Sequence, residues 1–182
     1  MEKDPNGVIP IDEWRTDLWL QAMEDSSLTE MAKKAYQLWK LTRLESVVLS
    51  DEIKRMLLNL KESYKLLLLT NGDPQVQSEK LDHCSGWNYF ESVMISGNFP
   101  YEKPEPAIFE EAFQRLHLKS DECIMVGDSL SADIQGGVNA GVLATVWINS
   151  SDEDVTDVQP KPDFKLDSVL KLHKVLDKLN SS

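Results

Sequence analysis

The residues best suited to chemistry in this chain fall into three short motifs. In the first, the Thr70 hydroxyl and the backbone amides of Asn71 and Gly72 precede a predicted helix start, where unpaired N–H groups and the helix dipole favour an anion. In the second, Lys103 precedes Pro104, which disfavours helix at the lysine and so restricts where the ammonium can lie. Together these two motifs predict a phosphate pocket. Each alone is also typical of an ordinary turn or of a helix entry.

The third motif is a pair of carboxylates. Asp128 ends an apolar run after Gly127, and Asp133 follows near the start of the next predicted helix. Two carboxylates at a strand end form a hard oxygen site of the kind that Mg²⁺ uses, together with several waters. Asp133 could instead cap its helix, so the pair indicates a metal site only in combination with the other two motifs.

The composition predicts a single soluble globular protein. The 182 residues are 41% hydrophobic, enough for one α/β domain with a small helical appendage. The net charge of −12 disfavours binding to nucleic acid or to an anionic membrane. No apolar run approaches the roughly 20 residues of a membrane span, and no signal peptide is evident, so we expect a cytoplasmic protein. Cys84 and Cys123 cannot build a disulfide framework and are expected to be packing residues.

The first part of the chain predicts amphipathic helices. Apolar residues recur at helical spacing from Ile11 to Ala22, and Ser27 with Glu30 has the form of a capping box that opens a second helix. A third helix begins near Ser50. The first two helices need a surface to pack on, and we interpret residues 1–48 as a partial helical cap.

Strands and helices alternate through the rest of the chain. We predict strands at residues 66–69, 92–95, 123–126 and 143–148 and around Phe164. We predict helices from Pro74, capped by Asp73, at residues 106–116, at residues 132–140, where Gly141 ends the helix, and from Asp167. This order predicts an α/β fold, a Rossmann-like open parallel sheet with helices on both sides, formed by residues 49–182. The three motifs then meet at the carboxyl ends of the strands, where such sheets bind ligands.

The order of the motifs resembles the haloacid dehalogenase (HAD) superfamily of phosphatases. The threonine motif comes first, the lysine second, and the glycine with its acidic pair third. The resemblance covers about residues 10 to 180 and is strongest to members that dephosphorylate a nine-carbon sialic acid phosphate. It rests on the segments at residues 66–73, 102–106, 126–128, 133–137, 139–141 and 144–149, and on residues 38–44 in the cap.

This resemblance implies a Mg²⁺-dependent phosphatase that acts on a small-molecule sugar phosphate through an aspartyl-phosphate intermediate. By the same resemblance, Thr70, Asn71 and Lys103 hold the phosphate, and Lys103 is the catalytic residue that this chain retains. Asp128 binds Mg²⁺, and Asp133 supports either the metal or the lysine.

Arg43, at the end of the predicted cap, is a candidate for binding the carboxylate of the substrate. A guanidinium group matches a carboxylate with two parallel hydrogen bonds. Arg43 could instead be an ordinary cation at a helix terminus or a partner for Glu45, and the sequence leaves these alternatives open.

One motif of the superfamily has no counterpart in this sequence. In the family, an apolar strand ending in Asp-x-Asp supplies the nucleophile, the acid/base and a metal ligand, and it lies between the strands that end at Thr70 and Asp128. No strand of that kind precedes the cap helices here. We therefore expect only background activity from this chain alone, and unpaired strand edges on both sides of the missing strand.

Two interpretations remain open. The chain could be a phosphatase sequence shortened at its front, in which case activity belongs to a longer form. It could instead be a non-catalytic protein that keeps the phosphate pocket for binding, or that pairs with another subunit through its uncovered sheet. An in-frame upstream strand ending in Asp-x-Asp would support the first interpretation, and a proven translation start at Met1 the second.

Overall fold

The computed structural model describes residue 4, residues 7–151 and residues 158–181, and these divide into two compact units. Unit 1 holds the described residues up to Leu49 together with Gly72–Asn88. Unit 2 holds Ser50–Asn71 and the described residues from Tyr89 onward. The chain therefore passes between the units after Leu49, Asn71 and Asn88. The boundary that we predicted between cap and core, at residue 48, lies beside the first of these crossings, and the extent of a functional cap stays a prediction.

Unit 1 is helical. Its main elements are α1 (Ile11–Ala22), the 3₁₀ turn η1 (Ser26–Leu28), α2 (Thr29–Glu45) and α4 (Pro74–His83). Helix α2 packs against both α1 and α4, and its inner face buries Ala32 and Tyr36. Helix α4 begins as predicted, because the Asp73 side chain accepts a hydrogen bond from the Val76 N–H at 3.1 Å and Pro74 occupies the first turn.

The predicted capping box at the start of α2 is wrong. Asp25 accepts hydrogen bonds from both the backbone N–H and the hydroxyl of Ser27, at 2.9 and 2.7 Å. Ser27 consequently lies inside η1, and Leu28 precedes α2 without a side-chain cap. Glu30 pairs with Lys33 instead of reaching back to Ser27. An aspartate two residues upstream competes for the hydroxyl that the sequence pattern assigned to the cap.

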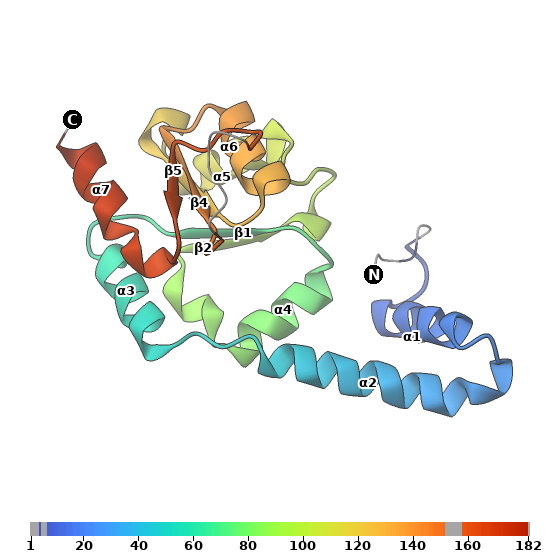
Figure 1. Cartoon of the computed structure of the whole chain (residues 1–182). Helices are drawn as coiled ribbons and strands as arrows, with labels where there is room; N and C mark the ends of the chain where they lie inside the picture. Colours follow the sequence, from blue (N-terminus) through green and yellow to red (C-terminus); the bar gives the residue numbers. More distant parts are fainter. Residues whose placement is uncertain (1–3, 5–6, 152–157, 182) are drawn as a thin grey trace. The chain divides into compact units, whose positions relative to one another are not determined.

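Unit 2 is an α/β structure (Figure 1). Its strands are β1 (Leu67–Thr70), β2 (Ser92–Ile95), β3 (Ile124–Gly127), β4 (Ala144–Ile148) and β5 (Phe164–Leu166). Its helices are α3 (Asp51–Lys61), α5 (Pro106–Leu116), α6 (Gln135–Ala140) and α7 (His173–Asn180), with a π-helical turn η5 (Leu130–Ile134) before α6 and a 3₁₀ turn η6 (Val169–Lys171) before α7. The alternation of strands and helices confirms the predicted fold class.

The strands form two parallel sheets. Strands β1 and β2 pair with each other, and β4 lies between β3 and β5. Among the described residues, no backbone pairing joins β1 to β3. This is the position at which the sequence predicts two unpaired edges.

Two hydrophobic clusters hold the sheets and helices of unit 2 together. In one, Ile108 and Phe109 of α5 pack against Met94 of β2, with Leu67 of β1 and Met125 of β3 at its border. The other gathers side chains of β3, β4, β5, α3 and α7 around Val146, Leu172 and Val175. The first cluster touches strands of both sheets, so side-chain packing connects them where backbone hydrogen bonds do not.

The helix ends of unit 2 follow the expected chemistry. Ser50 caps α3 through a hydrogen bond from the Ile53 N–H at 3.3 Å. Gly141 ends α6 with φ +67°, a conformation that glycine adopts without strain. The helix predicted at residues 132–140 begins earlier and differently, as the π-helical turn η5 capped by the Ser129 hydroxyl. Within the described ranges, no helix is both long and apolar enough to cross a membrane.

Candidate active site

Lys103 is the centre of the candidate site. Its side chain is buried, with 9% exposed, and its Nζ donates hydrogen bonds of 2.7 Å to the Leu69 carbonyl and to Asp133 Oδ1. Asp133 is equally buried. The ammonium therefore connects the end of β1 to the turn that follows β3, and two of the predicted site residues form a direct ion pair.

Asn71 fixes the loop that carries Lys103. Its Oδ1 accepts a hydrogen bond from the Lys103 backbone N–H at 3.0 Å, and its Nδ2 donates to the Lys103 carbonyl at 2.8 Å. Both ends of the amide side chain are thus used to hold the lysine backbone. The structure brings these motifs together, and the Asn71 side chain has a positioning contact that its place in the sequence did not indicate.

The strand end before Asn71 leaves a hydroxyl close to this loop. Thr70 is half-buried, and its Oγ1 donates a long hydrogen bond, 3.4 Å, to the Asn71 carbonyl. Gly72 follows with φ +130°, and a Cβ there would lie 2.7 Å from Nε2 of Gln77. The positive φ of Gly72 therefore favours glycine in the turn after β1, because other residues adopt this conformation only with strain.

Asp133 is held on both oxygens. While Oδ1 pairs with Lys103, Oδ2 accepts a hydrogen bond from the Ser129 N–H at 3.0 Å. Its carboxylate packs on Gly127, where an added Cβ would lie only 2.2 Å from Oδ2. Ser129, rather than Asp133, supplies the side-chain cap of the following turn. Gly127 and Ser129 thus support Asp133, and neither role was predicted.

Asp128 differs from Asp133 in its exposure and in its side-chain contacts. It is exposed, and its carboxylate makes no hydrogen bond or ion pair with the residues that the structure describes. Its backbone carbonyl accepts a hydrogen bond from Trp147 Nε1 at 2.9 Å, which anchors the loop after β3. Asp128 is therefore available to bind a cation, whereas Asp133 is occupied by Lys103.

The donor set is incomplete for Mg²⁺, which takes about six oxygen ligands from protein, substrate and water. No group of three or more histidine, cysteine, aspartate or glutamate side chains in the described part of the chain could hold a metal ion. With the Asp133 carboxylate engaged by the lysine, Asp128 is the one predicted metal ligand that is free to bind. The described residues alone do not form a magnesium site.

Arg43 lies near the end of α2 in unit 1. Its guanidinium stacks over the Trp39 ring, 5.2 Å from the centroid. No ion pair with Glu45 is present among the residues described, so that alternative is not observed. Burial, together with the positive charges of Arg43 and Arg15, lowers the pKa of Lys80. Neither Lys80 nor Arg15 was predicted from the sequence, because their interaction with Arg43 depends on the packing of three helices.

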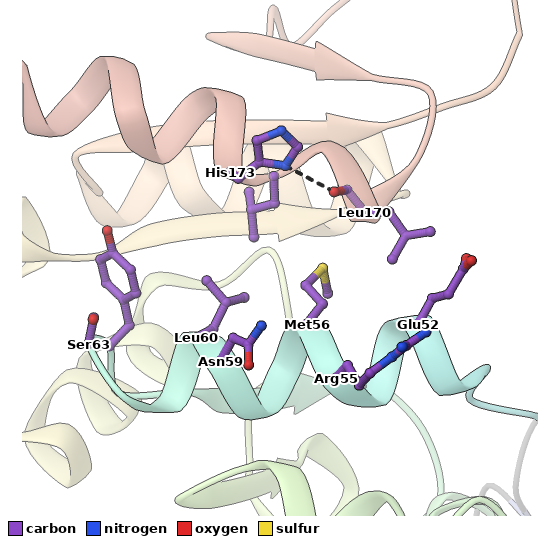
Figure 2. Close-up of a pocket in the computed structure, with 10 residues that line it drawn as sticks. Glu52, Arg55, Met56, Asn59, Leu60, Ser63, Leu170 and His173 are labelled. Atoms are coloured by element: carbon purple, nitrogen blue, oxygen red, sulfur yellow. Dashed lines mark hydrogen bonds between the residues drawn. The ribbon is translucent and has the colours of Figure 1, made fainter.

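A groove of about 510 Å³ in unit 2 lies apart from these residues (Figure 2). It runs between α3 on one side and η6 with the start of α7 on the other, with Met56 and Leu60 facing Leu170 and His173. The His173 Nδ1 lies 3.2 Å from the Leu170 carbonyl oxygen, which fixes the imidazole on one wall. None of the predicted site residues lines this groove.

The chain is similar in sequence to known proteins of one family. Residues 13–147 match the family described as haloacid dehalogenase-like hydrolase. N-acylneuraminate-9-phosphatase of Mus musculus is 41% identical over 170 residues, which is 91% of this chain and 68% of the relative. The enzyme of the same name from Homo sapiens is 40% identical over 174 residues, covering 93% of this chain and 70% of the relative.

Solved structures share the fold. The putative HAD-hydrolase YfnB of Bacillus subtilis, crystallised with magnesium, superimposes with a TM-score of 0.67 and 24% identity, covering 94% of this chain and 74% of that one. The motifs, the parallel sheets and the matched family agree with one another. The chain belongs to the haloacid dehalogenase-like hydrolase family.

Proposed function

We propose that this chain carries the phosphate-binding part of a sugar-phosphate phosphatase specific for N-acylneuraminate 9-phosphate, and that hydrolysis needs an Asp-x-Asp strand that these 182 residues lack. The buried contact of Lys103 with Asp133 and with the end of β1 is the observation that carries the proposal. A lysine buried at the carboxyl ends of parallel strands suits phosphoryl transfer, in which catalysis is mostly positioning and electrostatic stabilisation. The 41% identity to a phosphatase of that name supports the choice of substrate.

Each motif has a separate part in this function. The Thr70 hydroxyl and the backbone N–H groups of Asn71 and Gly72 donate to the phosphate oxygens, and the Lys103 ammonium balances their charge. Asp133 and the Asn71 side chain position the lysine, as their contacts favour. Hydrolysis of the bound phosphate ester also needs a nucleophile, which must come from outside these residues.

Mg²⁺ is the cofactor that this function requires. Asp128, exposed at the end of β3, would supply one carboxylate ligand to the ion, and its remaining ligands would have to come from outside the described residues. When bound, the ion would neutralise charge on the phosphoryl group. Asp133 contributes indirectly, by holding Lys103.

Arg43 is our candidate for binding the carboxylate of the sugar acid. Burial, and after it the positive charges of Arg43 and Arg15, lower the pKa of Lys80, and a bound carboxylate would offset these charges. Such a contact would distinguish a nine-carbon sugar acid from a neutral sugar phosphate. It agrees with the printed names of two relatives that are 40 and 41% identical to this chain.

A second function is supported by the sheet edges. Strands β1 and β3 each lack a partner on one side among the described residues, and exposed edges can pair with another chain. In this alternative, the chain is a non-catalytic phosphate-binding protein or one subunit of a pair. It retains the same phosphate contacts, so the two proposals are separated by whether an added Asp-x-Asp strand restores hydrolysis, and not by phosphate binding.

Titration of the purified chain with inorganic phosphate, followed by calorimetry or ³¹P resonance shifts, tests the pocket. Thr70→Val keeps the side-chain shape and removes one hydrogen bond to a charged ligand, so we expect affinity to fall by about 10-fold or more. Lys103→Met should abolish detectable binding, while Lys161→Met, at an exposed position, should leave it unchanged. Equal affinity in the wild type and Thr70→Val would remove Thr70 from the site. Absence of binding by the wild type would contradict the proposed function.

A further inference from the structure

Helix α2 of unit 1 uses one face for packing inside the unit. This face buries Ala32 and Tyr36, and α1 lies along it (Figure 1). Lys40 follows on the same face, with its Nζ 2.9 Å from Oδ2 of Asp12 on α1 and 2.8 Å from Oε1 of Glu79 on α4. The inner face of α2 is therefore directed at the other two helices of its unit.

The opposite face of α2 carries an exposed apolar stripe. Met31, Leu38 and Leu41 are 56, 67 and 59% exposed, and Val48, just beyond the end of the helix, is 67% exposed. Positions 31, 34, 38, 41, 45 and 48 alternate steps of three and four residues, which is the spacing of the a and d positions of a coiled coil. The two positions of this series that are not apolar are charged. The outer stripe of α2 thus has the pattern of a coiled-coil contact with another helix.

The two charged residues of the outer stripe decide how it can pair. Lys34 and Glu45 are exposed, and neither forms an ion pair with the residues that the structure describes. Two copies of α2 can lie antiparallel with Lys34 of each opposite Glu45 of the other. The same register places each leucine of the stripe opposite the other leucine of the second copy, and Met31 opposite Val48. A parallel pair would instead place lysine against lysine and glutamate against glutamate, so the stripe is complementary to itself in the antiparallel direction.

We infer that the outer stripe of α2 is an interface between two copies of this chain, which pair antiparallel about a two-fold axis. Leucines form the centre of the contact, and an ion pair flanks it on each side. A second copy fits the stripe because it supplies both the apolar positions and the complementary charges in one register. The 17 residues of α2 span about 25 Å, so the interface is small and the dimer is weak. The inference concerns unit 1 alone and does not depend on the proposed function.

Sedimentation equilibrium of the full chain tests this interface. We expect the mean mass to rise from one chain toward two as the concentration increases from about 5 to about 500 µM. Leu38→Glu puts a carboxylate into the apolar centre and should keep the chain monomeric throughout this range. Leu58→Glu changes an exposed leucine of α3 in unit 2, and this matched control should dimerise like the wild type. A wild type that stays monomeric at every concentration would overturn the interface and leave the stripe to a partner of another kind.

Exchange of the two charges tests the direction of pairing. Lys34→Glu and Glu45→Lys each create two like-charge contacts in the antiparallel dimer, so each should weaken dimerisation several-fold. The double variant restores opposite charges at both contacts and should dimerise like the wild type. A double variant that dimerises no more tightly than the single ones would overturn the antiparallel register.

The positions changed on α2 are exposed, so circular dichroism should show the same helix content in every variant. Phosphate binding should also be unchanged, because none of these residues belongs to the candidate active site. Equal dimerisation in the wild type and in Leu38→Glu would place the association elsewhere, for example at the edges of β1 and β3, and would overturn the inference.

Discussion

Strand β4 and the strands β1 and β3 are similarly apolar, yet only β4 is buried along its length. Four of the five residues of β4 are buried, and this strand pairs with β3 on one side and β5 on the other. All residues of β1 and β3 are half-buried, and each strand pairs on one side among the described residues. Apolar sequence alone therefore does not produce a buried strand, because burial in a parallel sheet also needs neighbours on both sides.

The same two strands carry the candidate site. Lys103 contacts the Leu69 carbonyl of β1, and its partner Asp133 packs on Gly127 at the end of β3. Polar side-chain contacts thus link the two sheets. They connect the ends of β1 and β3, between which no backbone pairing is present among the described residues.

An added strand should have the largest effect on the difference in burial between β4 and the strands β1 and β3. We expect an apolar strand ending in Asp-x-Asp, joined to residue 1 by a flexible linker, to raise the stability of unit 2 by on the order of 5 kcal/mol, because several half-buried side chains of β1 and β3 become buried. Amide exchange in both strands should slow, which mass spectrometry can measure. The same strand ending in Asn-x-Asn should stabilise equally. A fusion that leaves exchange in β1 and β3 unchanged would show that these edges are not its site.

Breaking the ion pair of Lys103 with Asp133, which links the ends of β1 and β3, should have the next largest effect. Lys103→Met leaves the buried Asp133 carboxylate without its cation, and we expect the free energy of unfolding to fall by about 3–5 kcal/mol. Lys171→Met, which breaks an exposed pair with Asp167, is the matched control and should cost less than about 1 kcal/mol. Urea unfolding measures both. Similar costs for the two variants would mean that the buried pair does not hold the strands.

A matched pair of valines compares the two environments directly. Val126 of β3 and Val146 of β4 are neighbours in register, and Val146 is fully buried while Val126 is half-buried. We expect Val146→Ala to cost about 2 kcal/mol and Val126→Ala about half as much, as measured by denaturant unfolding. In the fusion with an added strand, the cost at Val126 should approach that at Val146. Equal costs in the chain without the strand would contradict the difference in burial.

A change confined to unit 1 should have the smallest effect and leave both sheets unaffected. Burial opposes ionisation of Asp12, but hydrogen bonds from Tyr36 and Lys40 lower its pKa. Its stabilising contribution is therefore present above the unfolded value of about 4 and is lost as pH falls through the lower folded value. Because the Asp12 side chain is 42% exposed, we expect less than about 1 kcal/mol. Stability measured between pH 6 and pH 3 should fall more in the wild type than in Asp12→Asn, and parallel curves would contradict this.

Local sequence signals predicted most of the fold. Apolar runs located the strands, and Asp73, Ser50 and Gly141 located helix ends, because each acts on backbone groups within a few residues. The capping box at Ser27 failed for the same local reason, since Asp25 competes for the hydroxyl. Signals of this kind depend on immediate neighbours and are therefore readable without a structure.

The contacts of the site were predictable only in part. The resemblance left open whether Asp133 supports the metal or Lys103, and the buried ion pair of Asp133 with Lys103 is visible only in the structure. The bond between the Asn71 amide and the Lys103 backbone joins residues 32 positions apart, and side-chain direction at that range depends on packing. The contacts of Lys40 with Asp12 and Glu79 could not be predicted for the same reason, since three helices must pack before these side chains meet.

Phosphate release is the most direct measurement of the central claim. The purified 182-residue chain would be assayed with N-acylneuraminate 9-phosphate and Mg²⁺, beside its Lys103→Ala variant and beside the fusion that carries the Asp-x-Asp strand. We predict no release above the Lys103→Ala background from the chain alone, and a rate about a million-fold higher from the fusion, which supplies the nucleophile. Clear Lys103-dependent turnover by the chain alone would contradict the account, because it would require a nucleophile among these residues.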